Sequence, residues 1–320
     1  MVPVHNDADA GGFLAPVIAN WGVLAGVDKT GRGCMKLISY QSGRSNGIGL
    51  VANGGLLGLD AGDARFPGTL ADLIEAGEQR IRAAGDIIRE YGSAVDTNDV
   101  IRLPPCLPGK IICIGLNYAD HAAESDLPIP EFPVLFSRFS SSVIADGAAI
   151  RRPKVSTALD FEGELAVVIG KAGRYIPESG ALDHVAGYSI FNDATVRDYQ
   201  LRTSQWTIGK NFDATGPFGP YLVTPDELPL GASGLAIETR LNGQVVQKSS
   251  TDQLIFGVAK LIAAVSEAMT LQPCDVIITG TPAGVGHVRK PQLHMRAGDL
   301  VEVEIEQIGL LSNPIADEDI

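Results

Sequence analysis

The chain has 320 residues, of which 45% are hydrophobic and 20% are charged, a balance typical of a globular protein with a sizeable buried core. Its formal net charge of -13 argues against nucleic-acid binding, because no surplus of Lys and Arg is available to neutralise phosphates. No apolar stretch reaches the roughly 18–20 residues that span a bilayer, and no Lys or Arg precedes the apolar segment 12–27. We therefore expect neither a membrane partner nor a signal peptide.

The four cysteines have no paired or metal-type spacing, and Cys113 lies inside the apolar run 111–114, where it resembles a small buried hydrophobic residue. This pattern predicts reduced thiols and a cytoplasmic location.

The first 34 residues differ in character from the rest, and Met35 begins a clear strand pattern. Residues 1–34 are interpreted as an N-terminal extension or as a misassigned start. Strands at 35–40, 47–51 and 55–59, separated by glycine-rich turns, predict a small antiparallel unit. Thr69 is then expected to cap one long helix over 70–91, which Gly92 ends.

A proline cluster at 104–108 is interpreted as the linker into a second domain. Short strand patterns follow at 111–114, 164–169, 235–241, 276–279 and 300–305, with one helix expected over 252–269 behind a capping box of Ser250 and Gln253. Many strands around few helices predict an α+β fold. We expect a small α+β domain at 35–105 and a large domain with a rolled mixed sheet at 106–320.

Acidic residues alternate at the start of the strand pattern 159–170, where Asp160, Glu162 and Glu164 are each two residues apart. Side chains two apart on a strand share a face, so the three carboxylates are expected to point the same way. Their mutual repulsion is relieved if they share a cation, and oxygen ligands suit Mg²⁺, Mn²⁺ or Ca²⁺. A solvated strand end is the alternative interpretation.

The segment 187–200 (GYSIFNDATVRDYQ) runs from an apolar strand into polar residues. Asp193 is a candidate for a further carboxylate of the same site. Arg197 and Gln200 lie about one helical turn apart and are able to face one ligand. The alternative is an Asp that caps a helix beside a surface arginine.

His121 and Glu124 are three residues apart in the segment 115–124 (GLNYADHAAE) and become neighbours if that segment is helical. A carboxylate beside an imidazole fixes its tautomer and raises its basicity, as a general base requires. A surface pair is the alternative.

Two further segments are candidates for the same site. Lys210 lies beside a glycine in 206–213, where a solvated surface lysine is the alternative. The glycine-rich loop 280–286 (GTPAGVG) follows a strand but lacks the Gly-Lys-Ser/Thr ending of a phosphate loop, so we exclude nucleotide binding. Its backbone and Thr281 remain able to bind a small anion, and a plain turn is the alternative.

Taken together and in this order, five motifs resemble those of the fumarylacetoacetate hydrolase superfamily over roughly residues 106–314: GLNY…H…E at 115–124, DFEGEL at 160–165, GY…ND…RD at 187–198, GK…D at 209–213 and GTPAGVG at 280–286. Residues 35–103 resemble the smaller N-terminal domain of many members.

The resemblance implies specific roles for the candidate residues. It implies a metal, usually Mg²⁺ and sometimes Mn²⁺ or Ca²⁺, bound by Glu162, Glu164 and Asp193. It also implies a homodimer. The remaining implied roles are a His121–Glu124 catalytic dyad, an oxyanion-supporting Lys210, and substrate contacts from Arg197, Gln200 and Thr281.

Arg138 departs from the pattern, because many members carry a lysine there. Arginine prefers to pair with carboxylates in a bidentate manner. If Arg138 lines the site, it is a substrate-binding residue that favours an acidic substrate arm; a packing or dimer role is the alternative.

The implied chemistry is cleavage of a C–C bond in an acylpyruvate, a related 2,4-dioxo acid or a 1,3-diketone, through a metal-bound enolate. An isomerase, decarboxylase or hydratase acting on a 2-oxo or 2-hydroxymuconate-type acid would use the same metal site. A non-catalytic binding protein is disfavoured, because the chain keeps His121, Glu124 and Lys210.

Overall fold

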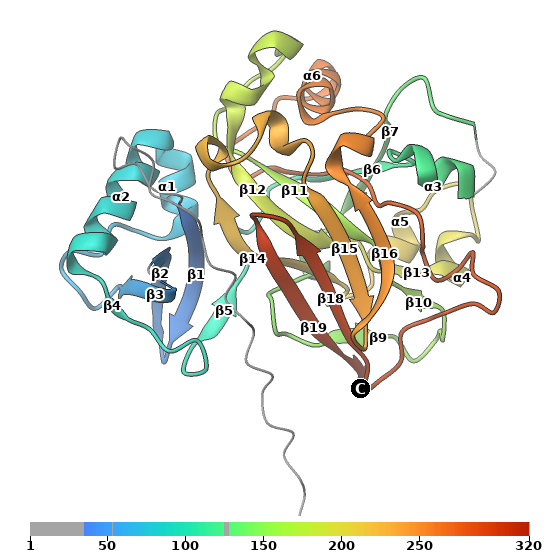
Figure 1. The fold of residues 1–320 in the computed structure, drawn as a ribbon, viewed down its shortest axis with the longest axis horizontal. Coiled ribbons are helices and arrows are strands. Elements are labelled where there is room, and N and C mark those ends of the chain that lie inside the picture. Colours follow the sequence, from blue (N-terminus) through green and yellow to red (C-terminus); the bar gives the residue numbers. More distant parts are fainter. Residues whose placement is uncertain (1–34, 53, 125–127, 320) are drawn as a thin grey trace, which may run out of the picture.

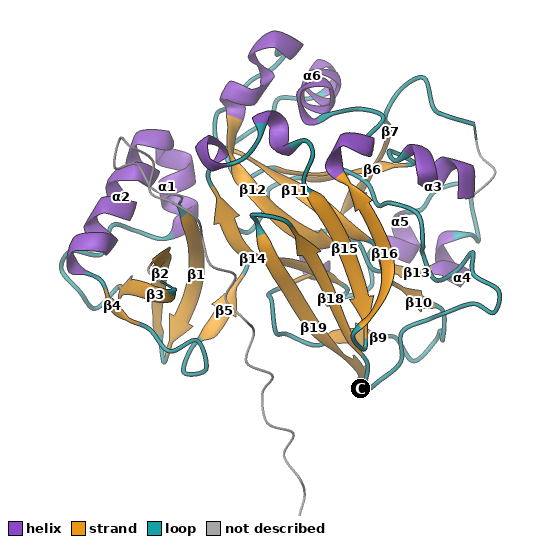
Figure 2. Ribbon diagram, viewed as in Figure 1, coloured by secondary structure: helices purple, strands orange, loops and turns teal. Residues whose placement is uncertain are grey.

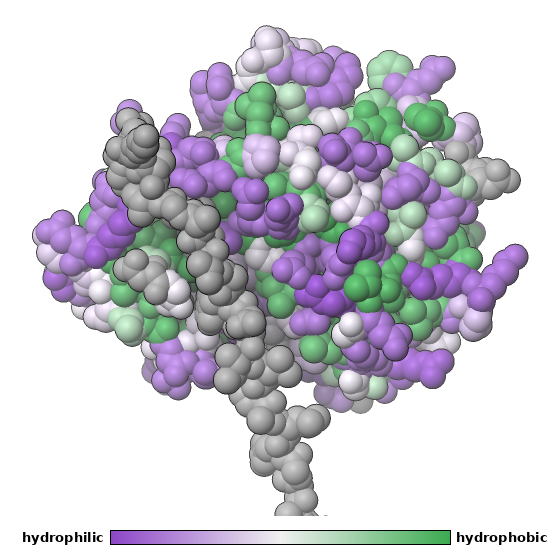
Figure 3. Space-filling view, in the orientation of Figure 1, coloured by the Kyte–Doolittle hydropathy of each residue, from purple (hydrophilic) through white to green (hydrophobic). Residues whose placement is uncertain are grey.

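The computed structural model describes residues 35–52, 54–124 and 128–319, so the predicted extension 1–34 lies outside the described residues. Two β-sheets form the body of the protein and helices pack around them, which confirms the predicted α+β class (Figures 1 and 2). In the described part of the chain, no helix is long and apolar enough to cross a membrane. Hydrophilic residues are spread widely over the face shown in Figure 3, as the large net charge leads one to expect.

The N-terminal part contains antiparallel strands with two helices packed against them. The strands are β1 (Lys36–Ser42), β2 (Ser45–Ala52), β3 (Gly55–Asp60), β4 (Ser93–Ala94) and β5 (Ile101–Leu103). The single helix expected over 70–91 is wrong: α1 (Leu70–Ala76) ends at Gly77 and α2 (Glu78–Tyr91) begins after it. Gly77 has a φ of 93°, which interrupts the helical path. Thr69 caps α1 as predicted.

The large sheet has twelve strands, and the N-terminal strands are part of it. Its main order is β4-β3-β2-β1-β14-β12-β11-β17-β6-β7. The join is the antiparallel pairing of β1 with β14 (Gly216–Val223), in which Lys36 faces Val223. The other central and edge strands are β12 (Val185–Asn192), β11 (Gly163–Ile169), β17 (Val276–Ile278), β6 (Ile111–Gly115) and β7 (Val134–Arg138).

One hydrophobic cluster crosses the proposed boundary between residues 105 and 106. It combines Leu50 and Ile74 from the N-terminal part with Cys113 and Val168 from the rest. The two proposed domains therefore share part of their core, and the position of the boundary stays a prediction.

The second sheet has five strands in the order β16-β15-β18-β19-β9. It covers one face of the large sheet: Val167 of β11 and Ile190 of β12 share a core with Ile237 and Val303 of the smaller sheet. The strands of this sheet are β16 (Gln244–Ser250), β15 (Ala236–Leu241), β18 (Leu300–Ile305), β19 (Gly309–Asp317) and β9 (Ile150–Arg152). The short strands β10 (Leu159–Asp160) and β13 (Thr195–Val196) pair together, and β8 (Val143–Ile144) pairs with β14.

The helix expected over 252–269 is shorter than predicted. Only α6 (Val258–Ala268) is α-helical, and Ser250 and Gln253 form no capping box. Asn117 prevents the helix from starting earlier. Its side-chain oxygen accepts the Phe256 backbone N–H at 2.8 Å, and its backbone carbonyl accepts the Ile255 backbone N–H at 2.8 Å. A tertiary contact thus outweighs local capping preference.

Three short helices gather at one end of the sheets (right side of Figure 1): α3 (Ala119–Glu124), α4 (Arg197–Gln200) and α5 (Thr207–Lys210). The remaining helical turns are 3₁₀ segments at Ser140–Ser142, Glu178–His184, Pro225–Glu227, Leu230–Ala232 and Thr251–Gln253.

We predict that Gly77→Ala lowers the free energy of unfolding by about 1–2 kcal/mol, because a side chain is strained at this positive φ. Urea unfolding followed by circular dichroism measures the change. Gly180→Ala is the control, since a Cβ there meets only Pro177 at an ordinary distance of 3.9 Å. Equal losses in the two variants would contradict the strain at Gly77.

Candidate active site

Three buried carboxylates converge where two neighbouring strands meet the loops at their ends. Glu162 immediately precedes β11, Glu164 is the second residue of β11, and Asp193 immediately follows β12. Because β11 and β12 are antiparallel and pair Gly163 with Asn192, the start of one strand lies beside the end of the other. Each carboxylate offers an oxygen within 4.8 Å of the others, a spacing suited to one shared cation.

Asp160 does not belong to this cluster, which corrects the expectation of three carboxylates on one strand face. The chain forms β10 and β11 as separate strands, so the alternation is broken between Asp160 and Glu162. The Asp160 carboxylate instead accepts the backbone N–H groups of Gly286 and His287 at 2.8 and 2.9 Å. It also pairs with the Arg197 guanidinium at 2.8 Å.

Two buried cations offset part of the negative charge. The Lys210 ammonium lies 2.6 Å from a carboxylate oxygen of Glu162 and 2.6 Å from one of Asp193. Arg197 lies 2.7 Å from the other Glu162 oxygen. Burial alone would raise the pKa of Glu162, but Lys210 and Arg197 outweigh it and lower that pKa. Burial would likewise lower the pKa of Lys210, which Asp193 and Glu162 raise instead.

Arg138 is fully buried behind Asp193 and is not among the residues that line the pocket described below. Its guanidinium donates to a side-chain oxygen of Asp193 at 2.5 Å, to the Ala194 carbonyl at 3.1 Å and to the Thr215 hydroxyl at 2.8 Å. Arg138 therefore does not reach the pocket as a substrate-binding residue would. It has the packing role that was the alternative, and it positions the Asp193 carboxylate.

Glu164 has no basic side chain paired with it among the described residues, and its carboxylate accepts the Gly280 backbone N–H. Burial, and the neighbouring carboxylates of Asp193 and Glu162, raise the pKa of Glu164 well above its ordinary value. A divalent cation would relieve this repulsion. The three carboxylates therefore fit a hard cation such as Mg²⁺ or Mn²⁺.

The carboxylates lie at a pocket of about 230 Å³, below the roughly 300–1,000 Å³ of sites for drug-sized ligands. Its size suits a small metabolite. Its polar lining consists of His121, Glu162, Glu164, Arg197, Gln200, Lys210, Thr281 and His287, and its apolar walls include Phe136, Leu201, Trp206, Val285 and Val288. A larger hollow of about 480 Å³ lies in the N-terminal part, but neither Lys nor His lines it, so we place the active site at the carboxylates.

His121 and Glu124 both lie on α3, as predicted, but no hydrogen bond joins them. Nδ1 of His121 is 3.5 Å from a Glu124 oxygen, beyond ordinary hydrogen-bonding distance. Glu124 instead accepts the Gly284 backbone N–H at 2.9 and 3.1 Å. The glycine-rich loop thus holds the carboxylate that was expected to orient the imidazole.

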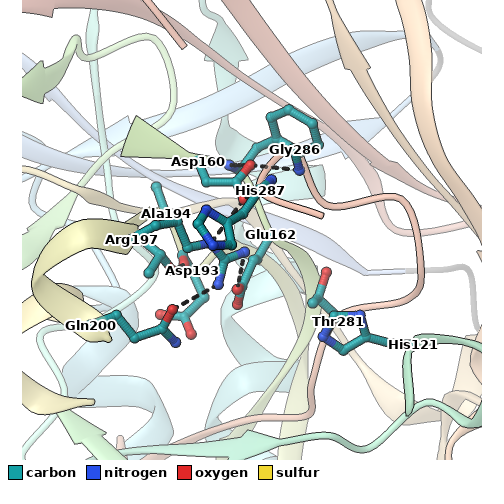
Figure 4. Close-up of polar contacts among 12 residues, drawn as sticks. His121, Asp160, Glu162, Asp193, Ala194, Arg197, Gln200, Thr281, Gly286 and His287 are labelled. Carbon is teal, nitrogen blue, oxygen red and sulfur yellow. Dashed lines mark hydrogen bonds and ion pairs between the residues drawn. The ribbon is translucent and has the colours of Figure 1, made fainter. Parts of the chain in front are cut away.

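The remaining predicted contact residues also reach the pocket (Figure 4). The side-chain oxygen of Gln200 accepts from Arg197 at 2.9 Å, which leaves its NH₂ group for another acceptor. Gln247 donates to the Thr281 hydroxyl at 2.8 Å, and that hydroxyl donates to the Gly163 carbonyl at 3.1 Å.

Sequence reasoning missed the pocket residue His287 and the supporting residue Gln247. His287 directly follows the glycine-rich loop, a position that could have identified it. Gln247 carried no signal, since it lies on an otherwise ordinary strand.

Buried carboxylates, a lysine and a histidine line one small pocket, a set of residues typical of an enzyme active site, and the three carboxylates could hold a metal ion. The comparisons give the same class. The family pattern described as fumarylacetoacetate (FAA) hydrolase C-terminal matches residues 110–316. The chain belongs to the fumarylacetoacetate hydrolase family.

Individual relatives differ in their named activities. A mitochondrial oxaloacetate tautomerase of Xenopus laevis is 40% identical over 88% of this chain and 90% of its own length. A fumarylacetoacetate hydrolase from Exiguobacterium antarcticum is 37% identical with a TM-score of 0.79, and a 5-carboxymethyl-2-hydroxymuconate delta-isomerase from Mycobacterium smegmatis is 32% identical with a TM-score of 0.71. Each of these two structures covers 89% of this chain and is itself covered completely. The superfamily resemblance is confirmed, and enzymes of this family include isomerases.

We predict that Arg138→Met lowers the free energy of unfolding by roughly 2–3 kcal/mol, because the buried Asp193 carboxylate loses its guanidinium partner and keeps only Lys210. Chemical denaturation measures the loss. Arg151→Met is the control, since Arg151 pairs with an exposed Asp319 at the surface and should cost at most about 1 kcal/mol. A similar cost for both variants would show that Arg138 does not position Asp193.

Proposed function

We propose that the protein is a metal-dependent isomerase that interconverts the keto and enol forms of a small 2-oxo acid of the oxaloacetate type. The observation that carries the proposal is the arrangement of His121 and Lys210 around one small pocket with the three carboxylates. The Xenopus laevis relative, named as an oxaloacetate tautomerase, supports the choice of substrate class.

Glu162, Glu164 and Asp193 would hold the cation, Mg²⁺ in our proposal with Mn²⁺ or Ca²⁺ as substitutes, and this Lewis acid would stabilise negative charge on the substrate oxygens. His121 removes a proton from the carbon next to the 2-oxo group. Lys210 adds positive charge near the developing oxyanion.

The proton then returns to the enolate oxygen, or to the same carbon in the reverse reaction, so no water is consumed. Thr281 and Gln200 provide polar contacts that orient the substrate. The apolar walls Phe136 and Trp206 limit access of bulk water to the pocket.

The hydrogen bonds that Glu124 makes favour this proton shift over hydrolysis. A hydrolase must activate and position a water, for which an imidazole hydrogen-bonded to a carboxylate is well suited. Here Glu124 is hydrogen-bonded to Gly284 and lies 3.5 Å from the imidazole. A single base is sufficient for keto–enol exchange.

Hydrolysis of a C–C bond in an acylpyruvate or related 2,4-dioxo acid is the second candidate. His121 and Glu124 are adjacent, so a small rotation of either side chain would join them. The Exiguobacterium antarcticum relative carries the hydrolase name. Decarboxylation and hydration would use the same carboxylates and have no specific observation in their favour. The homodimer and the cytoplasmic location stay predictions.

We predict that His121→Ala slows enol-to-keto conversion of oxaloacetate by roughly 10²–10⁴-fold, because it removes the imidazole that delivers the proton to carbon in this direction and takes it from carbon in the reverse direction. The decay of the enol absorbance in the ultraviolet, in Mg²⁺ buffer and corrected for the uncatalysed reaction, measures the rate. Mn²⁺ affinity should stay unchanged, which separates loss of the base from loss of the metal site.

Glu124→Gln distinguishes the two candidate functions. An isomerase should lose less than about tenfold in rate, since Glu124 only supports the loop. A hydrolase assayed by pyruvate release from acylpyruvates should lose roughly 10²-fold or more. Acylpyruvate cleavage by the wild type, without any acceleration of keto–enol exchange, would overturn the proposed isomerase.

A further inference from the structure

His287 lines the active-site pocket, although the proton shift does not use it. Figure 4 places its imidazole near Arg197, on the side of the site where Gln200 also lies, whereas His121 lies with Thr281 on the other side. The substrate therefore meets a second imidazole, away from the proposed base.

The backbone of His287 is held firmly in place. Asp160 is fully buried and accepts the N–H groups of both Gly286 and His287. A Cβ at position 286 would collide with the Leu293 carbonyl and with the Asp160 carboxylate, so glycine is needed for this close approach. The backbone of His287 is thus fixed relative to Arg197, which also pairs with Asp160.

The ring of His287 is also oriented by its neighbours. The Gln292 amide nitrogen donates to the His287 carbonyl at 3.0 Å and lies 3.3 Å from Nδ1 of the ring. Because that nitrogen is a donor, Nδ1 accepts and the proton of the neutral ring lies on Nε2. The ring of His294 stacks nearly parallel to it, with 6.0 Å between centroids.

The surroundings of His287 favour the neutral form of its imidazole. Burial, and then the positive charge of Arg197, lower the pKa of His287, whereas Asp160 raises it less. A neutral imidazole with its proton on Nε2 is a hydrogen-bond donor. The NH₂ group of Gln200, a second donor, lies on the same side of the pocket, and its oxygen accepts from an Arg197 guanidinium that is itself paired with Asp160 and Glu162.

Donors grouped in this way suit an anionic oxygen acceptor, and a carboxylate presents two such oxygens. The 2-oxo acid group of the substrate is already assigned to the cation and Lys210. The group that reaches His287 must therefore come from the other end of the molecule.

We propose that His287 is a specificity-determining residue whose Nε2–H, with the Gln200 amide, binds the second carboxylate of a dicarboxylic substrate. The proposal rests on the proposed function in one respect: the 2-oxo acid group occupies the carboxylate cluster. It deepens that function by selecting dicarboxylic over monocarboxylic 2-oxo acids.

Binding of a matched pair of unreactive ligands tests the proposal without requiring turnover. Malate and 2-hydroxybutanoate both carry a 2-hydroxy acid group, but 2-hydroxybutanoate has a methyl group where malate has its second carboxylate. Isothermal titration calorimetry in Mn²⁺ buffer gives both dissociation constants. We expect the wild type to bind malate at least about tenfold more tightly, as hydrogen bonds to a charged group warrant.

Three variants separate the role of the donor from general damage. His287→Phe keeps a flat ring but removes the donor, and should reduce the malate preference to near unity while Mn²⁺ affinity stays unchanged. His287→Gln keeps an N–H donor and should restore part of the preference. His184→Phe, the same exchange at a distant histidine whose Nδ1 lies 2.9 Å from the Lys171 carbonyl, should retain all of it.

Turnover provides a second measure. In His287→Phe, KM for oxaloacetate should rise about tenfold or more with little change in kcat, and KM for 2-oxobutanoate should not change. An unaltered malate preference in His287→Phe, or a wild type without any preference, would overturn the role of His287. If the wild type prefers malate but accelerates no keto–enol exchange, the proposed function fails while the carboxylate site at His287 stands.

Discussion

The arrangement of this protein depends on keeping a group of charged side chains stable in its interior. Burying an ion costs several kcal/mol unless it is paired and hydrogen-bonded. Four buried carboxylates and three buried cations surround the site: Asp160, Glu162, Glu164 and Asp193 against Arg138, Arg197 and Lys210. With all four carboxylates ionised, one negative charge is left unbalanced, and the raised pKa of Glu164 reflects this excess. A divalent cation would more than offset that excess.

The neighbouring structure follows from this requirement. The backbone N–H of Asp193 donates to the Glu162 carbonyl at 2.8 Å, and the Asn192 side chain accepts the N–H of Glu162 at 3.0 Å. These bonds join the ends of β11 and β12, so the carboxylates converge. The glycine-rich loop then approaches closely enough for its backbone to bond to Glu164, Asp160 and Glu124.

Local sequence patterns predicted much of the fold and of the carboxylate cluster. Strand alternation identified Glu162 and Glu164, and the strand that ends before Asp193 supplied the third carboxylate. The same alternation failed at Asp160, because the chain changes strands there and the side chain caps a distant loop. The two-residue alternation of side chains does not by itself reveal where a strand is interrupted.

Other features depended on contacts between residues far apart in sequence. Arg138 pairs with a carboxylate 55 positions later, so no local pattern showed that it faces Asp193 rather than a substrate. Asn117 determines where α6 begins from 139 positions away. His287 was missed because its orientation comes from Asp160 and Gln292 rather than from a motif.

The requirement for a cation among the buried carboxylates can be measured by Mn²⁺ binding to the wild type and to Glu164→Gln. Electron paramagnetic resonance counts the bound Mn²⁺, and competition with Mg²⁺ tests whether both ions share the site. Our account predicts one Mn²⁺ per chain, displaced by Mg²⁺, and a loss of about 100-fold or more in affinity in Glu164→Gln, which should stay folded. A wild type that binds no Mn²⁺, or a Glu164→Gln variant that binds it equally well, would contradict the account.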